Sequence, residues 1–218
     1  MSATSPPDGA MRADARRNRQ RLIEAALAAF ADHGADDASL DEIARRAGVG
    51  IGTLYRHFPT RQALLEAVYR SQVEALCVQA QDFSDRAGDA SATDALARWL
   101  GALVAFAATK RNLTISMMSS LGGKNSEVVS SCSAMIREAV APLLARAQQA
   151  GEIRPDVDVT DLLKMSHAIS VACEYPSSHS DQAQRLLTVM LDGLRHGAGR
   201  DGASQDGASP DGAALPAG

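Results

Sequence analysis

Residues 50–61 gather side chains whose chemistry suits a polyanion outside the fold. The stretch GIGTLYRHFPTR carries a hydroxyl at Thr53, a phenol at Tyr55 and an imidazole at His57, with small glycines at its start. Such groups, like guanidinium groups, can hydrogen-bond to phosphate oxygens and base edges. Glycines keep the start of the segment narrow, so that its backbone amides can approach a ligand closely. These residue types at this spacing predict a helix that contacts DNA.

The candidate DNA-contacting residues lie on this segment and at the starts of its neighbours: Ser39, Gly50, Ile51, Gly52, Thr53, Tyr55, Arg56, His57 and Arg61. Ser39 and Arg61 each begin an adjoining helix, where a side chain can meet a phosphate. Leu54 and Phe58 face the other way and would anchor the segment in a small core. Taken one at a time, tyrosine and histidine at such positions are more often half-buried structural residues. The prediction that this segment contacts DNA therefore depends on all these residues occurring together in one short, glycine-flanked helix.

The elements that must hold this segment follow from the spacing of apolar residues. Apolar side chains recur every three or four positions over 16–33, which predicts a first helix, and Gly34 supplies its stop. Ser39 precedes a second, short helix that ends at Gly48, with Glu42 in the capping-box position. We expect these two helices to support the DNA-contacting one.

The third helix covers about 51–57, and Pro59 prevents its continuation past Phe58. Thr60 can cap a long fourth helix over 61–83. Two short helices separated by a glycine turn predict a helix-turn-helix. In that motif the second helix enters the major groove of double-stranded DNA while the first crosses the backbone.

Helical patterns continue beyond this unit, and no alternating strand pattern interrupts them. They cover about 93–109, 111–121, 125–150, 158–175 and 179–196, and a polar loop lies at 85–91. Pro142 lies inside one pattern and predicts a kink or a break there. The fold class is therefore all-α.

Composition and charge distribution narrow the function classes. The net charge is −4, yet residues 1–61 hold nine arginines against eight acidic residues, and RADARRNRQR alone carries five arginines. A local basic segment matters more for nucleic-acid binding than the total charge. We expect a flexible basic arm over 1–15. The Asp-Gly-Ala-rich stretch 197–218 holds one leucine and predicts a disordered tail.

The cysteine content and the apolar runs favour a cytoplasmic protein. Three widely spaced cysteines indicate neither a disulfide framework nor a metal site, and we expect no metal and no cofactor. No signal peptide or membrane-spanning run is evident, so we expect no membrane partner.

The stretch LIEAALAAFADHGADDASLDEIARRAGVGIGTLYRHFPTRQALLEAV resembles the DNA-binding domain of the TetR family of bacterial transcriptional repressors, over about residues 17–68. The signature IA..AGV..GTLY.HF..R..LL is intact and highly specific. The resemblance implies DNA-contacting roles for Gly52, Thr53, Tyr55, His57 and Arg61, the last standing where lysine is more usual. It also implies a homodimer, built through the last two helices, that reads two half-sites of a palindrome.

The chain then divides into a helix-turn-helix domain over 16–68 and a regulatory, ligand-binding and dimerisation domain over 69–196. Its last two helical patterns carry apolar residues on more than one face: Leu162, Leu163, Met165, Ile169 and Val171, followed by Leu186, Leu187, Val189, Met190, Leu191 and Leu194. One face could pack on the domain and another on a second copy. The alternative is that both faces belong to the core of one chain.

The resemblance implies that the regulatory domain surrounds a small-molecule pocket. The candidate ligand-binding residues are Trp99, Phe106, Met117, Met118, Met135, His167, Cys173 and Glu174, because methionines adapt to irregular ligands and a buried His or Glu can orient a polar group. Methionines at helical spacing are more often core residues, and a single histidine is usually a satisfied interior group. SLGGKNS lacks the spacing of a phosphate-binding loop.

The sequence thus predicts a ligand-responsive DNA-binding regulator rather than an enzyme. We expect a repressor that an unknown small-molecule effector releases from its operator. One alternative keeps the fold but makes the chain an activator or a co-regulator controlled by a protein partner. A distant alternative is an enzyme that uses Cys173 with His167 and Glu174.

Overall fold

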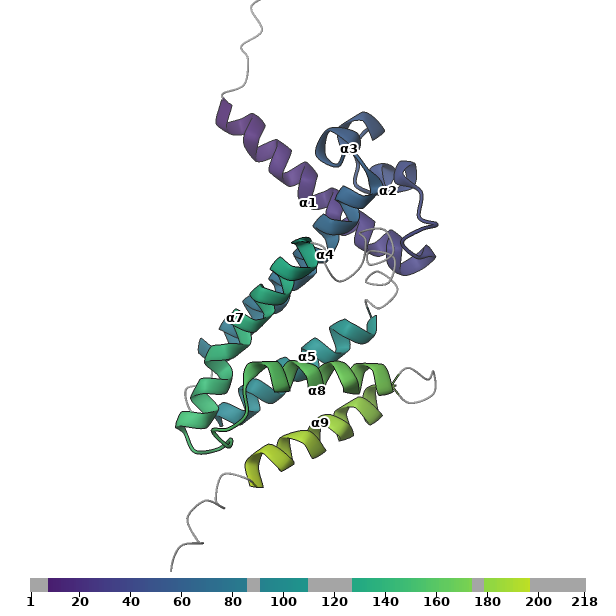
Figure 1. The fold of residues 1–218 in the computed structure, drawn as a ribbon. Helices are drawn as coiled ribbons and strands as arrows, with labels where there is room; N and C mark the ends of the chain where they lie inside the picture. The colour runs from purple at the N-terminus through teal and green to yellow at the C-terminus, as the bar shows by residue number, and fades with distance from the viewer. Residues whose placement is uncertain (1–7, 86–90, 110–126, 174–178, 197–218) are drawn as a thin grey trace, which may run out of the picture.

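The computed structural model describes residues 8–85, 91–109, 127–173 and 179–196. These residues form helices and turns with no strand, which confirms the all-α prediction (Figure 1). The helices are α1 (Asp8–His33), α2 (Leu40–Arg46), α3 (Ile51–His57), α4 (Arg61–Asp85), α5 (Ala92–Thr109), α7 (Glu127–Gln149), α8 (Val159–Ala172) and α9 (His179–His196). The helix predicted at 111–121 and the predicted tail at 197–218 lie outside the described residues.

Helix α1 is longer than the sequence analysis predicted. We set its start at Arg16 and expected a flexible arm over 1–15, but residues 8–15 are helical. The stripe of buried residues on this helix begins only at Leu22, so the hydrophobic spacing gave no signal for the earlier turns. Alanines at 10, 13 and 15 favour helix without any packing partner.

The turns that connect the first three helices depend on two glycines in the left-handed region. Gly34 has φ +84° and its amide donates to the Phe30 carbonyl at 3.0 Å, which ends α1 as predicted. Gly48 has φ +68° and ends α2, where its amide donates to the Arg45 carbonyl at 3.1 Å. A side chain at either position would strain the backbone.

Two buried clusters organise the chain, and α4 contributes to both. The first contains Leu22, Ile43, Leu54 and their neighbours together with the start of α4 at Leu64 to Val68. The second contains Leu76 and Ala80 from α4 with residues of α5, α7, α8 and α9. Helix α4 therefore connects the two clusters rigidly, and α8 and α9 lie at the end of the molecule away from α1–α3 (Figure 1).

Helix α7 runs beside α4 and continues through Pro142 without a break (Figure 1). A break was one of the two predicted outcomes and is wrong: α7 is one helix despite its proline. By length and mean hydropathy α7 could also cross a membrane. It carries core residues such as Cys132, Val140 and Leu143, and Arg146 donates to the Ser84 carbonyl of α4 at 2.6 Å, so α7 packs here as a core helix.

Candidate nucleic-acid interface

Helix α3 buries one side and presents the other to solvent. Leu54 and Phe58 are 1% and 2% exposed in the first cluster, whereas Tyr55 is 49% exposed and Arg56 is exposed beside it. Thr53 and His57 are half-buried, with part of each surface open. The expected helix boundaries, 51–57, agree with the structure. The outward side thus presents a phenol and a guanidinium to solvent.

The glycines at the start of α3 are not required by the fold itself. A Cβ atom added to Gly50 or Gly52 would meet no heavy atom within 4 Å, and neither residue has a positive φ. A side chain there would project into open space. The narrow profile therefore gives no advantage to the isolated chain, whereas it lets an outside partner approach the backbone of α3 closely.

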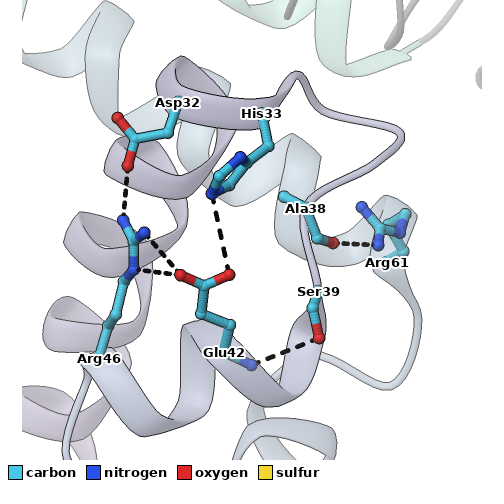
Figure 2. Close-up of polar contacts among 7 residues, drawn as sticks. All are labelled: Asp32, His33, Ala38, Ser39, Glu42, Arg46 and Arg61. Carbon is cyan, nitrogen blue, oxygen red and sulfur yellow. Dashed lines mark hydrogen bonds and ion pairs between the residues drawn. The ribbon is translucent and has the colours of Figure 1, made fainter.

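A charged network fixes α2 against the end of α1 (Figure 2). Arg46 donates from Nη1 to Asp32 Oδ2 at 2.8 Å and from Nε to Glu42 Oε1 at 2.9 Å, and His33 Nε2 lies 3.9 Å from Glu42 Oε2. The hydrogen bond from Arg46 lowers the pKa of Asp32 below its ordinary value. The network orients α2, the helix that precedes the exposed α3.

Ser39 fulfils only half of the predicted capping box. Its Oγ accepts from the Glu42 amide at 3.5 Å, which caps α2 as expected, but the Glu42 carboxylate turns to Arg46 and His33 (Figure 2). The charged guanidinium of Arg46 attracts the carboxylate more strongly than a backbone amide does. Ser39 itself remains exposed at the start of α2.

Arg61 does not point outward as a phosphate contact would. Its Nη1 donates to the Ala35 carbonyl at 2.5 Å. Its Nη2 donates to the Ala38 carbonyl, as Figure 2 shows. The guanidinium thus holds the loop between α1 and α2 from the start of α4. The sequence gives no signal for this role, because the loop and Arg61 are more than twenty residues apart along the chain.

A basic ridge on α1 lies next to α3. The α1 ridge consists of Arg12, Arg16 and Arg19, which share one helical face at four- and three-residue steps, and all are exposed. The Arg19 guanidinium carbon lies 5.4 Å from the centre of the Phe58 ring, directly after the last residue of α3. The ridge therefore extends the positive surface beyond the end of α3. The number of arginines in this segment indicates a basic surface, but only the structure shows that it lies next to α3.

The five predicted ligand-binding residues that the structure describes have different surroundings. Trp99 is fully buried and donates from Nε1 to the Leu76 carbonyl at 3.0 Å, so it joins α5 to α4. Phe106 packs its ring 6.3 Å from that of Tyr69. Met135 is half-buried on α7, and Cys173 is buried at the end of α8. Met117, Met118 and Glu174 lie outside the described residues.

His167 lines a cavity among the described helices. This cavity of about 400 Å³ lies between α5, α7 and α8, and its wall also includes Ser133, Arg137 and Lys164. The sequence does not predict these three residues as part of a site, because polar residues on a helix surface give no signal until the helices are packed. Cys173 remains in the core, apart from this wall.

Two known protein families match this chain, one in each half. Residues 22–68 match the family described as bacterial regulatory proteins, tetR family, and residues 91–196 match the family described as transcriptional regulator SbtR-like, C-terminal domain. A regulator of Pseudomonas putida, named as the uncharacterised HTH-type transcriptional regulator TtgW, is 47% identical over 64 residues, which cover 29% of this chain and 48% of that one. The chain spans less than half the length of the curated relatives that it matches first.

Solved structures match nearly the whole fold. A TetR transcription regulatory protein from Mycobacterium vanbaalenii is 37% identical with a TM-score of 0.66, and the match covers 85% of this chain and 99% of that one. A TetR transcriptional regulator from Streptomyces coelicolor is 35% identical with a TM-score of 0.68, covering 81% and 98%. Both similarities extend through the regulatory helices as well as the DNA-binding ones.

Proposed function

The chain belongs to the TetR family of transcriptional regulators, and from this premise we propose that it is a repressor that binds a palindromic operator as a homodimer and is released by a small molecule. The observation that carries the proposal is the outward side of α3, where Tyr55 and Arg56 are exposed beside two glycines that the fold does not need. A helix of this profile fits the major groove.

The proposed DNA footprint combines α3 with the start of α2 and the α1 ridge. Thr53, Tyr55 and His57 would contact bases and phosphates, and Ser39 would meet a phosphate from the start of α2. The α1 ridge adds sequence-independent phosphate contacts next to α3. Arg61 acts as a positioning residue in this proposal, because it holds the loop that leads to Ser39.

The proposed dimer uses α8 and α9. Large apolar residues on these two helices remain exposed in the single chain: Met165 is 41%, Val171 46% and Val189 68% exposed. The opposite sides of the same helices are buried, as at Leu162 and Leu194. The alternative that both faces serve the core of one chain therefore leaves these residues unexplained. Pairing two copies through this surface would place two α3 helices on one operator.

Release by a ligand requires a path from the regulatory helices to α3. Helix α4 enters both buried clusters, and α7 packs along α4, with Arg70 Nη1 3.4 Å from Ser131 Oγ and Cys77 Sγ 3.6 Å from the Met135 carbonyl. A ligand that favours one arrangement of α7 would change the separation of the two α3 helices through α4. The shift is limited by the difference in ligand affinity between the two arrangements.

The experiment is selection of bound sequences from a random DNA pool, followed by affinity measurements with variants. We expect an inverted repeat. Gly52→Ala should keep or raise the thermal stability, because its Cβ meets nothing and alanine favours helix, yet it should weaken operator binding at least tenfold by obstructing the groove. Tyr55→Ala should abolish operator binding without unfolding the chain.

The matched control is Gly101→Ala on α5, where an added Cβ also meets no atom within 4 Å. We expect this variant to bind the operator as the natural chain does. If Gly52→Ala and Gly101→Ala both bind normally, α3 does not approach DNA closely and the proposal fails.

The remaining alternatives have direct tests. An activator or a co-regulator controlled by a protein partner would raise expression in a reporter assay at the bound promoter, whereas a repressor lowers it. We propose no enzymatic activity: Cys173 is 4% exposed within the core, while His167 is exposed in the cavity wall.

A further inference from the structure

The cavity between α5, α7 and α8 has an apolar wall and a basic one. Its volume of about 400 Å³ falls in the range that holds small organic ligands. Leu103 and Ala107 of α5, Ile136 of α7 and Leu163 of α8 form the apolar wall. We call this space the α5–α7–α8 cavity. An aliphatic or aromatic group would be taken out of water there.

The polar groups of the cavity are basic or hydroxylic. Arg137 of α7 and Lys164 of α8 are exposed side chains on its wall, and His167 follows one turn after Lys164. Among the described residues that line the cavity, none is acidic, and neither Arg137 nor Lys164 forms an ion pair within the described part of the chain. The local charge contrasts with the negative charge of the whole protein and attracts an anion.

A buried hydroxyl on α8 adds a second polar feature to this wall. Ser166 lines the cavity and is 2% exposed, and its Oγ has no hydrogen-bond partner within the described structure. A buried polar atom without a partner costs free energy, which a partner from a ligand would recover after a side-chain rotation. Such unpaired groups are rare in folded proteins, and this one lies in the wall of the cavity, where a ligand can reach it.

From these observations we infer that the α5–α7–α8 cavity binds an anionic amphiphile, a small molecule with a carboxylate head and an apolar body. Arg137 and Lys164 hold the carboxylate by charge-assisted hydrogen bonds, and the apolar body lies against Leu103 and Leu163. This inference rests on the proposed function, since it names the chemical class of the effector.

Helix α7 also connects this cavity with the DNA-binding cluster. Val128, near the start of α7, packs against the first buried cluster. Arg137 lies further along the same helix and lines the cavity. A helix transmits displacement along its axis with little loss, since its backbone hydrogen bonds are internal. A carboxylate bound at Arg137 therefore acts on the DNA-binding unit through α7 directly, in addition to the route through α4.

The test is isothermal titration of the full chain with three probes that share one apolar chain: octanoate, octanol and octylamine. We expect octanoate to bind, octanol to bind at least tenfold more weakly because it lacks the charge, and octylamine to bind more weakly still. In the double variant Arg137→Gln/Lys164→Gln, the affinity for octanoate should fall to that for octanol. Leu163→Trp should weaken all three by filling the cavity.

The matched control is Arg98→Gln, which removes one positive charge from an exposed position of α5 away from the cavity and should leave octanoate affinity unchanged. Circular dichroism verifies that each variant is folded. Equal affinity for the three probes, or an unchanged octanoate affinity in the double variant, would overturn the inference.

The titrations contain no DNA, so they separate this inference from the proposed function. A chain that selects an inverted repeat but shows no preference for octanoate is the proposed regulator with a different effector, and the inference about the cavity fails. A chain that prefers octanoate through Arg137 and Lys164 but selects no DNA supports the cavity and overturns the proposed function.

Discussion

A carboxylate from the loop after α7 caps the start of α5, and its removal is a direct test of how the regulatory helices are held. Glu152 Oε2 accepts from the Ser91 hydroxyl at 2.5 Å and from the Thr93 amide at 2.9 Å. The negative charge thus lies at the N-terminus of α5, where free amides and the helix dipole stabilise it. Glu152→Gln keeps an acceptor oxygen but removes this charge.

The expected loss of stability follows from these two bonds. The bond from Ser91, with that from the Thr93 amide, lowers the pKa of Glu152 to about 2. A charge-assisted bond is stronger than a neutral one by about 1 kcal/mol, so two of them lose about 2 kcal/mol in Glu152→Gln. The pKa shift alone would give about 3 kcal/mol, which solvent around this partly exposed carboxyl reduces.

The same shift predicts a pH dependence with a definite sign. Because folding lowers the pKa of Glu152, the carboxylate stabilises the folded chain fully above its unfolded pKa, and this contribution is lost as pH falls toward the folded value. The stability difference between the natural chain and Glu152→Gln should therefore be about 2 kcal/mol at neutral pH and should narrow between about pH 5 and pH 3.

Urea unfolding at several pH values, followed by circular dichroism, measures this difference. Glu138→Gln makes the same chemical change on an exposed position of α7 and should alter the free energy of unfolding by less than about 0.5 kcal/mol. A Glu152→Gln variant as stable as the natural chain at neutral pH would refute the reasoning, and so would a difference that does not change with pH.

Other expected outcomes concern packing and assembly. Arg61→Gln should destabilise the DNA-binding unit by about 1–3 kcal/mol, since two loop carbonyls lose their donor, and thermal unfolding measures this. Trp99→Phe should cost about 1–3 kcal/mol in urea unfolding, because the buried hydrogen bond from the indole to the Leu76 carbonyl is lost and the smaller ring leaves part of the core unfilled. Val189→Glu should shift the chain from dimer to monomer in size-exclusion chromatography with light scattering, because it places a charge on an apolar surface, whereas an unchanged mass would count against the α8–α9 dimer.

Local sequence signals located the DNA-binding helices closely. Gly34, Gly48 and Pro59 end helices by backbone geometry that needs no tertiary partner, so the bounds of α3 could be predicted to the residue. The exposure of Tyr55 also followed from the sequence, because Leu54 and Phe58 four residues apart must share the buried side. The start of α1 could not be predicted in this way, since none of residues 11–21 is buried.

Side chains that act across the fold were decided by tertiary structure. Arg61 carries the same charge whether it meets a phosphate or the carbonyls of a loop, and only the packing of α4 against that loop selects the carbonyls. The cavity residues Arg137 and Lys164 come from different helices and look like ordinary solvent-exposed positions along each of them.

The amino-acid sequence by itself thus determined the all-α character of the described residues and the bounds and outward side of α3, because these depend on interactions within a few residues along the chain. The partners of Asp32, Arg61 and Glu152, and the basic wall of the α5–α7–α8 cavity, were decided by the tertiary structure alone. Each depends on which distant segments meet in space, and a charged side chain binds whichever partner the packing brings within reach.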